Sequence, residues 1–109
     1  MSSSLVSRIK TASIIADDVD GDRTTYSIFA SAMSEAGELG QELSIHHGDS
    51  YKTASEDGVI GEAIDTIITL LDLIHVHNPE FTEEELNEYA SKKATKWLKK
   101  IHLCAVIKF

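Results

Sequence analysis

The segment that most constrains the fold is residues 59–76, the longest predominantly apolar stretch of the chain. Its length approaches that of a membrane span. However, Glu62, Asp65 and Asp72 interrupt it, and each carboxylate would be expensive in hydrocarbon. Isoleucine and leucine side chains recur at helical spacing between these acids. We therefore predict a helix over residues 55–77, at the centre of a bundle that does not enter a membrane and more buried than any other element.

Three further helices are predicted from apolar periodicity and from cap and stop signals, over residues 4–16, 24–46 and 82–101. Thr82 and Glu85 form a capping box at the start of the last one. The apolar, β-branched residues 103–109 predict either a short strand or a tail docked on a partner subunit. The sequence thus predicts one all-α domain over residues 1–109, a four-helix bundle.

Composition narrows the class of protein further. One proline and six glycines among 109 residues argue against a sandwich or barrel of many short strands. A chain of this size buries a limited share of its surface, so completion of the bundle by oligomerisation, as a homodimer or homotetramer, is expected. A net charge of -8 argues against a protein that coats nucleic-acid polymers. The single cysteine, Cys104, and a start without an apolar leader suit the cytoplasm.

Carboxylates form a stripe on each of the two central helices. Glu35, Glu38 and Glu42 fall within about a 60° arc of one helix. Glu62, Asp65 and Asp72, with Thr69, fall within about an 80° arc of the next. Acids opposite an apolar face are typical of any solvated amphipathic helix, but these two stripes belong to consecutive helices and so are placed to face each other.

Two local features favour a binding role for the stripes. No lysine or arginine lies within four residues of the acids at 35, 38, 62 and 65 to relieve their repulsion. Gly37 and Gly40 interrupt the first acidic helix at a cost of about 1 kcal/mol each, which suggests a close neighbour. Clusters of carboxylate oxygens suit hard cations, so we expect Mg²⁺, for which Mn²⁺ can substitute.

The segment Glu35-Ala-Gly-Glu38-Leu, followed by Glu62-Ala-Ile-Asp65, resembles the ExxE…ExxD signature of the MazG-like, all-α nucleoside triphosphate pyrophosphohydrolases. The resemblance covers residues 26–100. It implies the all-α pyrophosphatase type of bundle and an enzyme that converts a nucleoside triphosphate, with or without the 2′-hydroxyl, to the monophosphate and pyrophosphate. Nucleotide-pool control or removal of aberrant nucleotides would be its use.

The resemblance also implies roles for residues. Glu35, Glu38, Glu62 and Asp65 would be the metal ligands, and Glu35 or Glu38 would also act in catalysis on the attacking water. Basic residues of the last helix would meet the phosphates, and the matching positions are Lys92, Lys93 and Lys96. Trp97 stands where many relatives have asparagine.

Other interpretations remain beside this one. A relative selective for dUTP or dCTP would carry the same signature, and a non-catalytic helical interaction module would need no metal. The lysines also complement the dipole of a helix that begins with three glutamates. Four aromatic side chains could stack on a base, but a bundle needs aromatic core residues, so we expect them in the core: Tyr26, Phe29, Tyr89 and Trp97.

Overall fold

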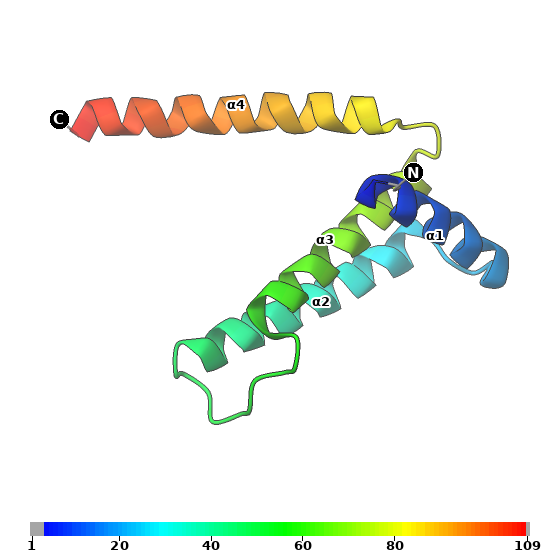
Figure 1. The fold of residues 1–109 in the computed structure, drawn as a ribbon, viewed down its shortest axis with the longest axis horizontal. Helices are drawn as coiled ribbons and strands as arrows, with labels where there is room; N and C mark the ends of the chain where they lie inside the picture. The colour runs from blue at the N-terminus through cyan, green and yellow to red at the C-terminus, as the bar shows by residue number, and fades with distance from the viewer. Residues whose placement is uncertain (1–3, 109) are drawn as a thin grey trace. The chain divides into compact units, whose positions relative to one another are not determined.

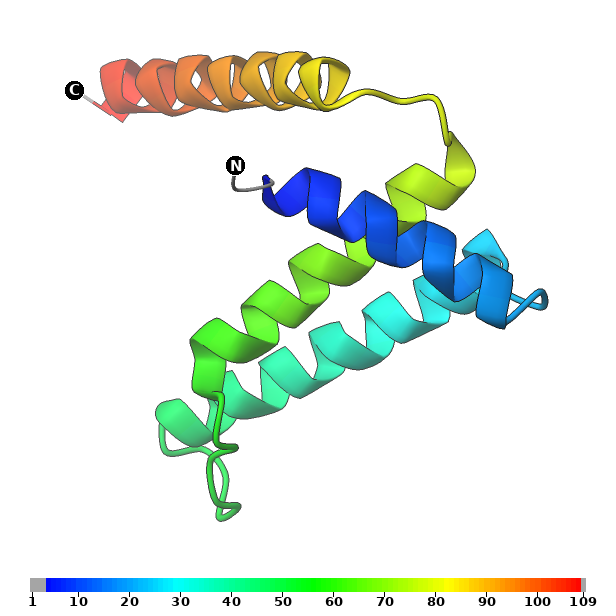
Figure 2. The ribbon, with the colours of Figure 1, turned by 45° about the vertical axis from the view of Figure 1, so that its right-hand side comes forward.

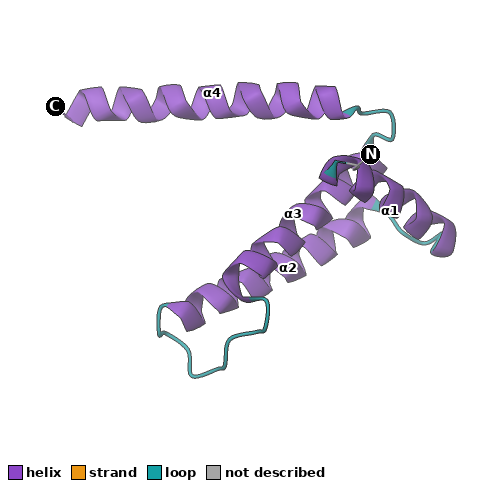
Figure 3. Cartoon of the chain, viewed as in Figure 1, coloured by secondary structure: helices purple, strands orange, loops and turns teal. Residues whose placement is uncertain are grey.

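The computed structural model describes residues 4–108, and of residues 104–108 it describes the backbone alone. This part of the chain forms four α-helices and no strand (Figures 1 and 3). They are α1 (Leu5–Val19), α2 (Thr25–His46), α3 (Gly58–His77) and α4 (Glu83–Lys108). The all-α prediction is confirmed. The chain divides into two compact units, Met1–Pro79 and Glu80–Phe109.

A hydroxyl side chain caps the N-terminus of three of the helices. Ser4 accepts a hydrogen bond from the Ser7 amide at 3.1 Å at the start of α1. Thr24 and Ser27 exchange side-chain and backbone bonds at the start of α2. The predicted box of Thr82 and Glu85 is present at the start of α4, at 3.1 and 3.2 Å. Each bond satisfies an amide that has no partner within its own helix.

The helix ends differ from the prediction in three places. α1 continues past residue 16 to Val19, because the Asp20 amide still bonds to the Ala16 carbonyl. The acids Asp17 and Asp18 therefore belong to the helix and not to the turn after it. α3 begins at Gly58, which has a φ of 67° that favours glycine. Residues 103–108 continue α4, so the predicted strand is wrong. Docking of this tail on a partner stays a prediction, and Phe109 lies outside the described residues.

The first unit is built on an antiparallel hairpin of α2 and α3, which lie side by side, and α1 crosses its open end (Figure 2). Few of its side chains are fully buried. Among described residues, the buried apolar side chains are Ile9, Ile28 and Ala32, and the buried polar ones are Ser13, Glu42 and Glu62. The centre of this hairpin is therefore as polar as it is apolar.

Among the residues described, α3 has the largest share of buried and half-buried residues of the four helices, as predicted, but several of its isoleucines are exposed. Glu62 is its one buried residue, whereas Ile60 is 76% exposed and Ile67 is 51% exposed. The carboxylate side of α3 faces α2, so its isoleucine side faces away. Phe29 of α2, which was expected in the core, is exposed, and so are Met33 and Leu43 of the same helix.

Arg23 fastens α1 to the hairpin. Its guanidinium donates to the Ser13 carbonyl at 3.0 Å, pairs with Asp17 at 2.9 Å, and forms a second salt bridge with Asp72 of α3. The Ser13 hydroxyl also donates to Asp72, at 2.6 Å. One arginine thus joins α1, the start of α2 and the end of α3.

The second unit is the single helix α4 with the turn before it. The Phe81 ring lies against Tyr89, with ring centres 5.7 Å apart. Trp97 and Tyr89 are mostly exposed, as is Tyr26 of the first unit, so the expectation of core aromatics is wrong for the described chain. No helix among residues 4–108 is long and apolar enough to cross a membrane.

Candidate metal centre

Three carboxylates converge between α2 and α3. Glu35 comes from α2, and Glu62 and Asp65 come from the first half of α3. One carboxylate oxygen of each lies within 4.8 Å of the other two. The i, i+3 spacing on α3 and the antiparallel pairing with α2 bring the three together, and we call them the carboxylate cluster.

The cluster holds buried carboxylate oxygens that have no hydrogen-bond partner. Glu62 is 8% exposed, and its Oε2 atom has neither solvent contact nor a hydrogen bond. The Oε2 atom of Glu35 is in the same condition. Buried polar atoms in folded proteins are nearly always paired, so two such oxygens at one place are an unusual feature of this hairpin.

The electrostatics of the cluster disfavour charge in the absence of a cation. Burial raises the pKa of Glu62, and the carboxylates of Glu38, Asp65 and Glu35 raise it further. Burial also raises the pKa of Glu35, with Glu38 and Asp65 adding to the effect. Within the described residues, no salt bridge reaches the cluster. A hard cation would relieve both desolvation and mutual repulsion.

The remaining acids of the two stripes have separate positions. Glu38 is exposed and lies near enough to raise the pKa of both glutamates of the cluster. Glu42 is buried, and it accepts a hydrogen bond from the Ser55 amide at 2.7 Å. Asp72 is held by Arg23 and Ser13. The two stripes face each other at Glu35, Glu62 and Asp65, as predicted. Glu42 and Asp72 contact Ser55 and Arg23 instead.

The structure gives Glu42 and Arg23 roles that the sequence did not suggest. Glu42 ties α2 to the connection before α3, and the Ser55 hydroxyl in turn accepts from the Gly58 amide at 3.1 Å. The sequence nevertheless contains a feature that could have pointed to Arg23. It is the one lysine or arginine between Lys10 and Lys52, in a segment rich in acids.

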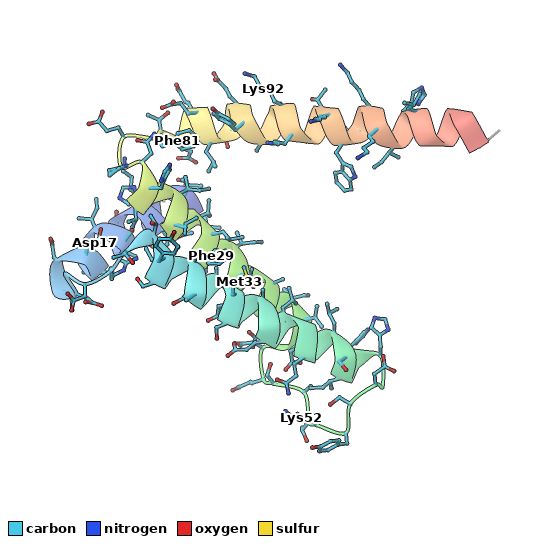
Figure 4. All side chains as sticks on the ribbon, turned by 180° about the vertical axis from the view of Figure 1, so that it is seen from behind. Asp17, Phe29, Met33, Lys52, Phe81 and Lys92 are labelled. Atoms are coloured by element: carbon cyan, nitrogen blue, oxygen red, sulfur yellow. The ribbon has the colours of Figure 1, made fainter. Side chains whose placement is uncertain are left out.

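The predicted phosphate-binding lysines are exposed on α4, in the second unit (Figure 4 labels Lys92). Lys92 and Lys96 share a face with Lys99, where the three line a hollow of about 310 Å³ with Ser91 and Thr95. Lys93 lies about 100° round the helix from Lys92, so it belongs to another face. Lys99, which the sequence did not single out, completes this row.

The glycines of α2 do not approach a neighbour within the described chain. A Cβ atom built at Gly37 or Gly40 would meet nothing within 4 Å. The expectation of a close backbone at these positions is therefore wrong within the described chain, and a close ligand stays a prediction.

The first unit is thus a helical hairpin with an oxygen-only carboxylate site between its two long helices. Comparisons with protein-family models, curated proteins and solved structures return no match to this chain. Interpretation of the site therefore depends on its own chemistry and on its motifs.

Proposed function

We propose that the chain is a Mg²⁺-dependent nucleoside triphosphate pyrophosphohydrolase of the MazG-like, all-α type, acting as a homo-oligomer. The observation that supports it most strongly is the pair of buried, unpartnered carboxylate oxygens of Glu35 and Glu62. They belong to the two motifs, ExxE and ExxD, that carry the resemblance. A coordinated cation would satisfy both atoms at once.

The residues present fit a hard divalent cation. The donors are carboxylate oxygens, with no thiolate or imidazole among them. This donor set suits Mg²⁺ or Mn²⁺ and is unsuited to softer metals. Glu35, Glu62 and Asp65 would hold the ion, and Glu38 stands beside them.

Bound Mg²⁺ would neutralise the triphosphate and increase the acidity of the attacking water. Glu38 is exposed and adjacent to the cluster, and it is proposed to orient that water and accept its proton. Water would attack the α- or β-phosphorus, and the products would be a nucleoside monophosphate and pyrophosphate. Glu35, with one oxygen enclosed in the cluster, fits the role of ligand better than that of base.

The basic row of α4 would complete the proposed enzyme. A triphosphate carries about four negative charges, and carboxylates repel it, so cations must surround it. Lys92, Lys93 and Lys96 are proposed as phosphate ligands on the resemblance, and Lys99 joins Lys92 and Lys96 on one face. A cytoplasmic enzyme of nucleotide-pool control, or a relative selective for dUTP or dCTP, would have the same parts.

A non-catalytic helical interaction module is the second candidate. Its support is the amount of exposed apolar surface on α2 and α3, which is unusual for a protein that acts alone. This module would not need a metal, so metal binding separates the two candidates.

The decisive experiment combines Mg²⁺ titration with an assay of pyrophosphate and orthophosphate on a panel of nucleoside triphosphates. We expect saturable Mg²⁺ binding, thermal stabilisation and release of pyrophosphate as the primary product. Asp65→Asn should weaken Mg²⁺ binding, and Glu38→Gln should lower kcat by about 100-fold or more while it keeps the fold.

Glu56→Gln is the matched control, because Glu56 is an exposed acid in the connection before α3. It should leave Mg²⁺ binding and activity unchanged. Full activity in Asp65→Asn, or orthophosphate as the primary product, would contradict the proposed enzyme.

A further inference from the structure

A second hollow lies on the α2–α3 hairpin, beside the carboxylate cluster. Its volume of about 290 Å³ is at the lower end of the range of small-molecule sites, which begins at about 300 Å³. All of its lining residues belong to the first unit, and none of them is a member of the cluster. We call it the hydroxyl pocket, after three hydroxyls that line it with two carboxylates and one guanidinium: Ser27, Ser31, Thr69, Asp20, Asp72 and Arg23.

The hydroxyl pocket continues the carboxylate cluster along the hairpin. Thr69 follows Asp65 by four residues on α3, and Ser31 precedes Glu35 by four residues on α2. Because the two helices are antiparallel, both steps run towards the same end of the hairpin (Figure 2). Each step is about 6 Å long, at about 1.5 Å per residue. One small molecule can therefore occupy the cluster and the pocket at once.

The hydroxyls of the pocket already donate their hydrogens to the backbone. Ser31 donates to the Ser27 carbonyl at 3.2 Å, and Thr69 donates to the Asp65 carbonyl at 2.8 Å. The Ser27 hydroxyl donates to the Thr24 carbonyl at 2.9 Å. A hydroxyl has one hydrogen and two lone pairs, so Ser31 and Thr69 present acceptor positions to a ligand.

The charged groups of the pocket add to this excess of acceptors. Asp20 and Asp72 accept hydrogen bonds and donate none when they are ionised. The guanidinium of Arg23, the one cation of the lining, bonds to two protein carboxylates, Asp17 and Asp72. Two carboxylates against one guanidinium give the lining a formal charge of -1. The pocket therefore suits a group that donates hydrogen bonds.

We infer that the hydroxyl pocket binds the exocyclic amino group of a nucleobase, and so selects a cytosine nucleotide over a uracil nucleotide. The amino group of cytosine donates hydrogen bonds, whereas the oxygen at the same position of uracil accepts them. That oxygen would face the acceptors of Ser31 and Thr69 and leave them unpaired. A single-ring base also suits the small volume of the pocket. The inference rests on the proposed function, which places the triphosphate at the cluster, and it separates dCTP from dUTP.

The test is the affinity of dCTP and of dUTP, measured by calorimetry with Mg²⁺ for the wild type and for the slow variant Glu38→Gln. We expect dCTP to bind at least about 10-fold more tightly. Deoxycytidine and deoxyuridine, titrated without metal, should differ in the same direction. Thr69→Val removes one acceptor and keeps the shape of the side chain, so it should lower the ratio of the two affinities by about 5-fold.

Thr66→Val is the matched control. Thr66 is half-buried on the same helix and donates to the Glu62 carbonyl at 2.9 Å, but it does not line the pocket. This change should leave the ratio of affinities as it is in the wild type. Equal affinity for dCTP and dUTP would overturn the inference, and so would an unchanged ratio in Thr69→Val.

The same titrations separate the inference from the proposed hydrolysis. Preference for dCTP without release of pyrophosphate would support the pocket and overturn the hydrolysis. Release of pyrophosphate with equal affinity for the two nucleotides would support the hydrolysis and overturn the pocket. Absence of nucleotide binding would overturn both.

Discussion

Glu62 holds a carboxylate between α2 and α3, where solvent does not reach its Oε2 atom. Such a group costs stability when it is ionised, because neither solvent nor a cation compensates its charge. Its position is therefore explained by binding better than by folding. A cation would turn the least favourable group of the hairpin into a link between its two helices.

The raised pKa of Glu62 predicts how pH changes the stability of the metal-free protein. A carboxyl group whose pKa is higher in the folded state binds its proton more tightly there. Its contribution to stability is therefore complete below the ordinary value of 4.5 and is lost as pH rises through the raised value. In a chelating buffer, the melting temperature of Glu62→Gln should gain on that of the wild type as pH rises towards neutral.

The difference in melting temperature between the wild type and Glu62→Gln isolates the effect of Glu62 from that of the other acids. Asp49→Asn, an exposed substitution, should show no such divergence. If the melting temperatures of wild type and Glu62→Gln stay parallel over this range, the raised pKa is contradicted.

Glu42 is expected to act on stability and to leave metal binding unchanged. Its carboxylate accepts the Ser55 amide and belongs to no group of converging ligands in the described chain. Glu42→Ala should lower the free energy of unfolding by about 1–3 kcal/mol, and Glu42→Gln, which keeps an acceptor, should lower it less. Urea titration measures both, with exposed Gln41→Ala as the control, expected within about 0.5 kcal/mol of wild type.

Mg²⁺ titration of folded Glu42→Gln supplies the second measurement. Unchanged affinity is expected. Complete loss of Mg²⁺ binding would place Glu42 among the ligands, against the structure.

At the scale of elements, α1 depends on polar contacts more than on apolar packing. Ile9 and Ser13 are its buried residues, and the Arg23 salt bridge with Asp72 lies beside them. The side chains of this pair are 13% and 22% exposed. Removal of one partner leaves the other charge partly buried, which is the costly way to break such a pair.

Arg23→Met should therefore detach α1 at low denaturant concentration. It keeps the apolar stem and removes the charge, and we expect a loss of about 2–3 kcal/mol, below the value for a fully buried pair. Asp17→Asn is the control, because Asp17 is 45% exposed and its pair with Arg23 should contribute under about 1 kcal/mol. Amide hydrogen exchange of α1 reports the detachment, and equal effects of the two substitutions would contradict the role of Asp72.

At the scale of the whole molecule, the first unit carries two unusual features. The carboxylate cluster leaves two buried oxygens without a hydrogen-bond partner, and several isoleucines of α3 are exposed. The proposed Mg²⁺ ion would satisfy the first of these features.

Helix existence, type and capping were predicted from the sequence because they depend on neighbours along the chain. The box at Thr82 and Glu85 and the break at residues 78–79 are local interactions of this kind. The meeting of Glu35 with Glu62 and Asp65 was expected from the resemblance, and helical spacing explains why Glu62 and Asp65 share one face of α3.

Only the tertiary structure decided which face of each helix points inward. The apolar periodicity of residues 59–76 predicted burial of the isoleucines, yet α3 turns its carboxylates to α2. The structure likewise separated Glu42 and Asp72 from the cluster, because Ser55 and Arg23 hold them. The physical reason is that periodicity defines two faces of a helix, while its neighbours in the tertiary structure determine which face is covered.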